Sequence, residues 1–165
     1  MAKRVQFRRG TTSEHSSFTG AVGEVTVDTD KDIVVVHDGS TAGGIPSPSL
    51  SQAQTFTKAQ RGGVTTLTSS SNATAVDLSL NNFFTITLSE NTTFGAPTNA
   101  VAGQAGSIFI VQDGTGSRTG SFHANFKFTG GADPTLTTTA NAVDRIDYVV
   151  KSSTEIHAVA TLALA

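Results

Sequence analysis

Cysteine and tryptophan are absent from this 165-residue chain, which has a single tyrosine and a single methionine. Without cysteine the chain forms neither disulfides nor thiolate metal sites, so its redox compartment stays open. It contains no apolar run long enough for a signal peptide or a membrane span. We therefore expect a protein that is made in the cytoplasm and does not insert into a membrane.

Charge is also scarce. Only 15% of the residues are charged, the formal net charge is -2 at pH 7, and the pI is near 6.0. This balance argues against bulk electrostatic binding to nucleic acid or to anionic membranes. The chain has instead many short runs of valine, isoleucine and phenylalanine, separated by threonine, serine and glycine. This pattern is typical of an all-β protein.

The opening stretch has the densest positive charge of the chain, at Lys3, Arg4, Arg8 and Arg9. Nucleic-acid surfaces of this kind interleave basic with aromatic residues, and the protein as a whole is acidic. We therefore predict that the cluster contacts acidic residues of a neighbouring protein subunit and does not bind nucleic acid.

Two valine-rich strands are predicted over residues 24–28 and 33–37, and Asp38-Gly39 closes the hairpin as a turn. Val25 and Val27 alternate with polar residues, which predicts that the valines form the buried face of the first strand. The second strand is apolar on both faces. We expect its second face to be covered either by the rest of the chain or by another copy of it.

Two short helices are predicted from capping boxes, in which two side chains three residues apart satisfy backbone N–H groups. The first follows from Thr11 and Glu14, and the second, over residues 49–60, from Thr57 and Gln60. Proline and Gly-Gly pairs around the second helix mark residues 46–63 as a linker. This division predicts an N-terminal module over residues 1–45 and a C-terminal domain over residues 64–165.

Residues 64–165 read as strands at the spacing of an antiparallel β-sandwich, similar to a jelly roll. Two strands have apolar residues on one face, which we predict to be the core: Phe84, Ile86 and Leu88 in one, and Ile146, Tyr148 and Val150 in the other.

The strings VQFRRGTT, GEVTVDTD and VVVHDGS, within residues 5–40, resemble the N-terminal domain of the major tropism determinant, a module of bacteriophage fibre and receptor-binding proteins. The resemblance implies a trimeric β-prism that anchors a fibre to the virion. We place the subunit and virion interface at Arg4, Arg8, Arg9, Val34 and Val36. The later strings GSIFIVQDGTGSRTGSF and ANAVDRIDYVVKSSTEIHAV resemble a domain that recurs in phage tail proteins.

The sequence thus predicts a non-enzymatic phage structural protein that is located in the virion. It would form a homotrimeric tail fibre, spike or adaptor, dock to other virion proteins and present its β domain to a host glycan or protein receptor. One alternative is a capsid decoration protein, either a head fibre or a cement protein. Another is a carbohydrate-binding module or a small glycan hydrolase, which exposure of Tyr148, Phe122 or Phe126 in a cleft would favour.

No catalytic residue, metal site or cofactor is predicted. The acidic run over residues 28–32 begins like a calcium loop but lacks the later glycine and glutamate of an EF-hand. The four histidines lack metal-ligand spacing, although a three-fold axis would gather copies of His37 or His157 into a ring. Five carboxylates would in principle supply the acid and base of a glycoside hydrolase, but are read as turn and edge-strand residues: Glu90, Asp113, Asp133, Asp144 and Asp147.

Overall fold

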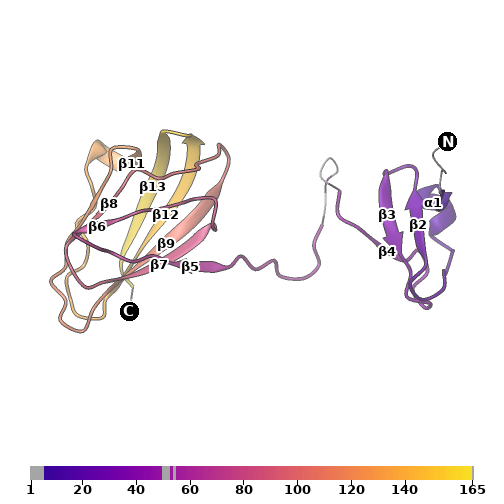
Figure 1. Cartoon of the computed structure of the whole chain (residues 1–165), viewed down its shortest axis with the longest axis horizontal. Coiled ribbons are helices and arrows are strands. Elements are labelled where there is room, and N and C mark those ends of the chain that lie inside the picture. The colour runs from indigo at the N-terminus through magenta and orange to yellow at the C-terminus, as the bar shows by residue number, and fades with distance from the viewer. Residues whose placement is uncertain (1–5, 50–52, 54, 165) are drawn as a thin grey trace. The chain divides into compact units, whose positions relative to one another are not determined.

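The computed structural model describes residues 6–49, 53 and 55–164. The chain divides into two compact units, Met1–Gln60 and Arg61–Ala165, and nearly all of the regular structure in both is β-strand (Figure 1). The predicted all-β class is therefore confirmed.

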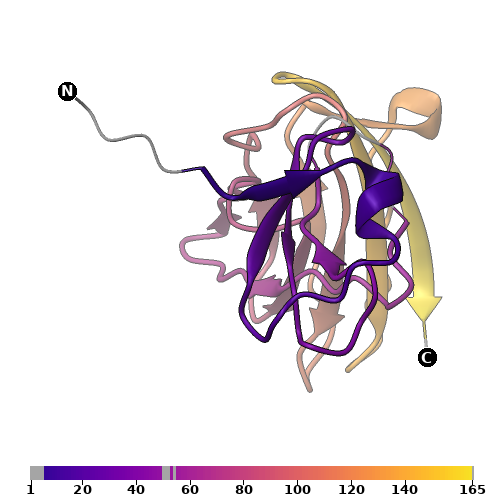
Figure 2. The same cartoon turned by 90° about the vertical axis from the view of Figure 1, so that its right-hand side faces the viewer.

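A four-stranded sheet of order β1-β2-β3-β4 forms the first unit. β1 and β2 are parallel, whereas β2, β3 and β4 follow one another as antiparallel neighbours. The helix α1 connects to the end of β1 at one side of the sheet (Figure 2). The elements are β1 (Arg8–Gly10), α1 (Thr12–His15), β2 (Val25–Asp28), β3 (Ile33–Val36) and β4 (Ile45–Pro46).

The first predicted capping box is confirmed. The Thr11 hydroxyl accepts a hydrogen bond from the Glu14 N–H at 3.2 Å, and the Glu14 carboxylate accepts one from the Thr11 N–H at 2.7 Å. Because these bonds satisfy donors that a helix of four residues leaves unpaired, α1 forms despite its length.

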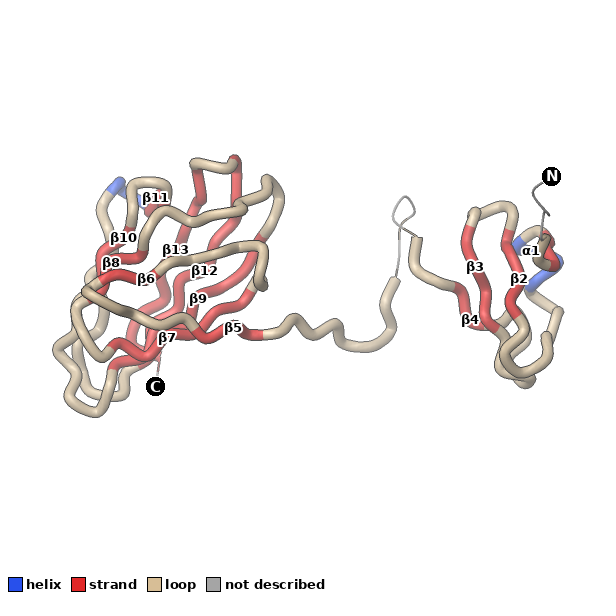
Figure 3. Tube along the Cα trace, viewed as in Figure 1, coloured by secondary structure: helices blue, strands red, loops and turns tan. Residues whose placement is uncertain are grey.

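The second predicted helix does not form over residues 55–60, which contain neither helix nor strand (Figure 3). The remainder of that prediction falls largely on residues 50–52 and 54, which lie outside the described residues. Gln60 does not close a capping box, and its side-chain amide donates to the carbonyl of Lys58 at 3.0 Å. A short helix needs an apolar face packed on a partner, and Phe56 is exposed.

In the first part of the second unit, successive strands alternate between two sheets. β5, β7 and β9 are parallel neighbours in a six-stranded sheet, and β6, β8 and β10 are parallel neighbours in a three-stranded sheet. Each pair of successive strands thus adds one strand to each of the two sheets. The strands are β5 (Val64–Thr66), β6 (Ala73–Thr74), β7 (Phe83–Leu88), β8 (Thr92–Phe94), β9 (Ala105–Gln112) and β10 (Gly120–Phe122).

A long antiparallel hairpin completes the six-stranded sheet. β12 pairs with both β9 and β13, and the short strand β11 lies parallel to β13 at the edge. The remaining elements are β11 (Phe126–Phe128), the 3₁₀ turn η1 (Thr129–Gly131), β12 (Val143–Ser152) and β13 (Glu155–Leu164).

The predicted antiparallel sandwich is therefore wrong in strand direction. Among the described strands of this unit, only the pairings of β12 with β9 and with β13 are antiparallel. Parallel and antiparallel strands with one buried face have the same alternation of apolar and polar residues, so the local pattern carries no information on direction. Direction depends on where each long connection returns the chain.

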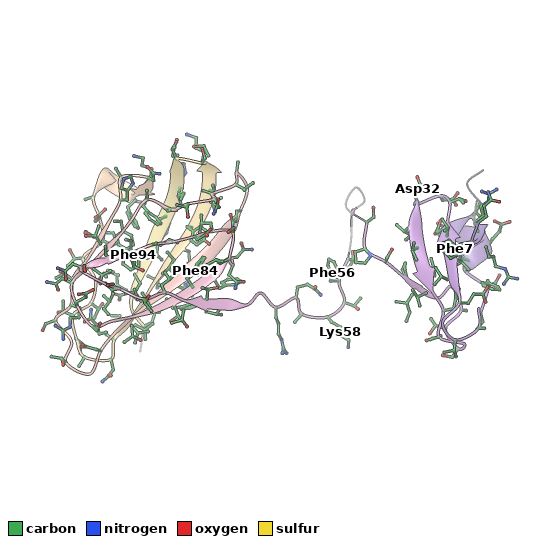
Figure 4. The ribbon with its side chains drawn as sticks, in the orientation of Figure 1. Phe7, Asp32, Phe56, Lys58, Phe84 and Phe94 are labelled. Carbon is green, nitrogen blue, oxygen red and sulfur yellow. The ribbon has the colours of Figure 1, made fainter. Side chains whose placement is uncertain are left out.

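The predicted core residues are confirmed. Phe84, Ile86 and Leu88 of β7 are fully buried, and so is the β12 side of the same core. Phe84 and Phe94 come from different sheets and both lie inside the unit (Figure 4). The two sheets thus enclose one continuous apolar core that contains Phe84, Ile86, Leu88, Phe94, Ile108, Ile110, Ile146, Tyr148, Val150 and Ile156.

The only tyrosine of the chain gives a pH-dependent probe of this unit. The buried Tyr148 hydroxyl donates to the carbonyl of Asn82 at 3.0 Å, and burial raises the pKa of Tyr148 to about 12. An unfolded tyrosine titrates near about 10. The folded state therefore keeps a proton that the unfolded state releases, and the unfolding free energy falls as pH rises from about 10 to about 12.

We expect tyrosinate absorbance of the native protein to rise only near pH 12, and that of the urea-unfolded protein to rise near about 10. Parallel spectrophotometric titrations of the two states measure this difference. Equal midpoints would contradict the buried, hydrogen-bonded placement of Tyr148.

Candidate subunit and virion interface

One face of the N-terminal sheet is open and mainly apolar. Side chains of residues paired across neighbouring strands lie on the same face. The strand register therefore puts six residues on this open face: Arg9, Val25, Val27, Val34, Val36 and Ile45. Val34, Val36 and Ile45 are 43%, 45% and 57% exposed. The open face is a contiguous set of branched apolar side chains with one arginine at its edge.

The opposite face is covered by α1 and the loop that follows it. His15 of α1 reaches the Thr26 hydroxyl at 2.8 Å, and the same hydroxyl lies 2.9 Å from Nε2 of His37. Val35 is buried on this side, and the Phe18 ring packs edge-on against His37 with centroids 5.1 Å apart. The small core of this unit is thus partly polar.

This arrangement reverses the predicted orientation of the first hairpin strand. Strand β2 alternates as expected, but its buried residues are Thr26 and Asp28, whereas Val25 and Val27 are only half-buried. The burial of Thr26 is offset by its two histidine partners, and that of Asp28 by a 2.7 Å bond from the Thr12 hydroxyl. Satisfied polar groups tolerate burial, so the apolar side of β2 is left for the open face.

The predicted interface residues divide between the two faces. Arg9, Val34 and Val36 lie together on the open face. Arg8 pairs with Thr26 across the strands and so belongs to the covered side. There its guanidinium group contacts Glu24 at 3.0 Å and lies 4.7 Å from the centre of the Phe18 ring. Arg4 lies outside the described residues.

Three members of the open face are not among the predicted interface residues: Val25, Val27 and Ile45. The alternation of Val25 and Val27 predicts only a buried face of their strand, and not a contact between subunits. Ile45 was placed at the linker boundary, next to two glycines, and only its pairing with Val36 reveals its position. Pairing between segments that are separated in sequence is not visible in local patterns.

The acidic run over residues 28–32 forms a hydrogen-bonded turn. The Asp28 carboxylate accepts bonds from the N–H groups of Asp30 and Lys31 as well as from the Thr12 hydroxyl. Burial opposes its ionisation, but these bonds outweigh the effect and lower the pKa of Asp28. Within residues 6–49, 53 and 55–164 there is no group of three or more histidines and carboxylates arranged to hold a metal ion.

His37 is buried under the covered face, so its ring is not on the surface that another copy would contact. His157 is exposed on β13, and its Nε2 lies 2.9 Å from the Glu155 carboxylate. Tyr148, Phe122 and Phe126 are buried in the core, so the exposure that would favour a sugar-binding platform is not found at these three residues.

The five candidate carboxylates each hold local structure. Glu90 accepts a bond from Ser69, Asp133 from the Phe122 N–H, and Asp144 from the N–H groups of Thr137 and Ala163. Arg118 donates two hydrogen bonds to Asp113, and Arg145 pairs with Asp147 at 2.9 Å.

No helix within the described part of the chain is both long and apolar enough to cross a membrane.

Comparison with known families gives two matches that together span most of the chain. Residues 5–41 match the "Major tropism determinant N-terminal domain". Residues 63–157, more than half of the chain, match the "Putative phage tail fibre C-terminal domain". The chain belongs to this phage tail fibre family.

The chain is also similar to individual known proteins. The "Tail fiber receptor-binding protein" of Bordetella phage BPP-1 is 54% identical over 76 residues, which are 46% of this chain and 20% of that protein. The chain thus spans about a fifth of this curated relative. The Major Tropism Determinant I1 Variant is 67% identical over 27% of this chain and 12% of its own, with a TM-score of 0.27. The Major Tropism Determinant U1 Variant is 26% identical over 94% of this chain and 31% of its own, with a TM-score of 0.28.

Proposed function

We propose that this tail fibre family member is a homotrimeric fibre or adaptor of the virion. Its N-terminal unit associates with two further copies through the open face and docks to the particle. Its C-terminal unit is displayed outward for attachment to the host surface. The observation that carries the proposal is the inverted burial of strand β2.

The inversion supports self-association because it leaves Val25 and Val27 half-buried at the open face while a threonine and an aspartate are buried on the other side. Together with Val34, Val36 and Ile45, these valines form an apolar surface of the kind that marks protein contacts. A copy of the same chain is a suitable partner because closed symmetric assembly buries the same face in every subunit. Arg9 at the edge of the face is then available to acidic groups of a neighbour.

A trimer also suits attachment. Three C-terminal units on one axis present three identical surfaces, so that weak contacts with a repetitive glycan or protein receptor add up to higher avidity. The names of the matched relatives, a tail fiber receptor-binding protein and a tropism determinant, support this role. No catalytic step is part of the proposal.

The number of copies of the chain in each purified phage particle tests the location. We expect quantitative mass spectrometry to find a small multiple of three copies, as tail fibres or adaptors at one vertex require. Hundreds of copies would contradict the tail location and support the capsid decoration alternative. Absence from the particle would contradict a virion role altogether.

A further inference from the structure

The covered face of the N-terminal sheet contains a continuous chain of hydrogen bonds between two buried histidines. Nδ1 of His15 lies 3.0 Å from the Thr11 carbonyl, and Nε2 of His15 lies 2.8 Å from the Thr26 hydroxyl. That hydroxyl lies 2.9 Å from Nε2 of His37, whose Nδ1 accepts the Gly20 N–H at 3.3 Å. Thr26 is fully buried.

The two ends of this chain fix the tautomer of each ring. A carbonyl oxygen only accepts, so Nδ1 of His15 carries a proton. A backbone N–H only donates, so Nδ1 of His37 carries none, and its proton is on Nε2. The bonds then run in one direction: His37 Nε2–H donates to the Thr26 oxygen, and the Thr26 O–H donates to His15 Nε2. Every donor has an acceptor when both imidazoles are neutral.

A further proton on either ring breaks this order. On His37 it would set two N–H groups, those of Nδ1 and Gly20, against each other. On His15 it would leave the buried Thr26 hydroxyl between two N–H donors, without either histidine as acceptor for its own hydrogen. Two charged rings would also repel, since their centroids are 6.3 Å apart. A buried polar group without a partner costs about 1–3 kcal/mol.

We propose that this histidine–threonine–histidine relay is an acid-sensitive lock, which holds the N-terminal unit closed when both imidazoles are neutral and releases it when they are protonated. Imidazole gains its proton between about pH 8 and 5. The lock is thus set for mildly acidic conditions, and its release would loosen the open face that lies on the other side of the same sheet.

The other charged groups near the relay do not account for a change in stability in this pH range. Arg8 of β1 and Glu14 of α1 line a pocket with His15 and carry opposite charges, whereas the Arg9 side chain lies on the open face. Asp28 and Glu24 are engaged by Thr12 and Arg8, β3 has no ionisable side chain, and Asp38 is bonded to Thr41. The hydrogen bonds of Glu14, Asp28 and Asp38 lower the pKa of each carboxyl, so these groups lose their stabilising charge only below this pH range.

Nuclear magnetic resonance of the full chain with ¹⁵N-labelled histidine tests the relay directly. At pH 8 we expect His15 to carry its proton on Nδ1 and His37 on Nε2. Either ring in the other tautomer, or either ring charged in the folded state at pH 5, would overturn the proposal. His123 and His157 are exposed and lie outside the relay, so their signals serve as internal controls.

Hydrogen exchange, corrected for the intrinsic effect of pH, tests the release. We expect the opening constant of segments in residues 8–46 to rise by up to about tenfold per pH unit for each imidazole, with no such rise in β9 and β12. The double variant His15→Gln/His37→Gln should lose this dependence, and the control His123→Gln/His157→Gln should keep it. Equal opening of the wild-type unit at pH 8 and 5 would overturn the lock. If the double variant does not fold, the wild-type titration and exchange still decide.

Discussion

Replacing Val34 and Val36 together with aspartate is expected to convert the proposed trimer, three chains of 17.0 kDa, into a monomer. Each valine buried at a subunit contact contributes about 1.5–3 kcal/mol, and an unpaired carboxylate in an apolar contact adds a penalty of several kcal/mol. The association constant should therefore fall more than about a thousandfold. Size-exclusion chromatography with light scattering at micromolar concentration measures the change.

The fold of the single unit should survive this change, because both side chains point away from its small core. Hydrogen exchange over residues 8–46 checks this. The control is Val22→Asp, which adds one aspartate, half of the added charge, to the same unit at an exposed loop position outside the sheet. A double aspartate variant that remains trimeric, or a wild-type chain that is monomeric, would contradict the open face as the subunit contact.

Substituting Gly106 of β9 with alanine is expected to destabilise the C-terminal unit strongly. A Cβ at this position would overlap the carbonyl oxygen of Asn82 and lie 2.6 Å from the Tyr148 hydroxyl. That carbonyl accepts bonds from the Tyr148 hydroxyl and from the Ser107 N–H, each at 3.0 Å. The methyl group therefore separates β7, β9 and β12 where they meet.

The expected cost is about 2–4 kcal/mol, from overpacking of about 1–3 kcal/mol and loss of a hydrogen bond worth about 1 kcal/mol. For a unit of this size we expect the melting temperature to fall by roughly 10–20 °C. Tyr148 fluorescence reports the unfolding of this unit alone, because the chain has one tyrosine and no tryptophan.

Gly114→Ala is the matched control. A Cβ at Gly114 would have no atom within 4 Å, and the residue lies in the turn after β9. Its effect should stay within about 0.5 kcal/mol. If the two alanine variants unfold at the same urea concentration as the wild type, the close approach of β9 to Asn82 is not a stability determinant.

Local patterns in the sequence were sufficient for features that depend on neighbouring residues. The capping box needs only Thr11 and Glu14, whose side chains and backbone groups meet within one helical turn. The buried faces of β7 and β12 follow from alternation alone, because every second side chain of a strand points the same way. The same reasoning identified Val34 and Val36 as apolar residues with no partner in their own hairpin.

Features that depend on pairing between distant segments needed the tertiary structure. The direction of β5 to β10 was predicted wrongly because alternation is the same for either direction. The burial of Thr26 became intelligible only with His15 and His37 as its partners, which come from a helix and from the end of another strand. Arg8 and Arg9 are adjacent in sequence, yet the strand sends them to opposite faces.

The all-β class, the core faces of individual strands, the first helix and the resemblance to phage fibre modules can all be predicted from the amino-acid sequence. These are encoded in propensity, alternation and short motifs. The three-dimensional fold is needed to know which strands are neighbours, which face of the N-terminal sheet is open, and that two histidines share one threonine. Such features arise from long-range pairing, where the energy of a buried polar group or an exposed valine depends on a partner that no local stretch of sequence specifies.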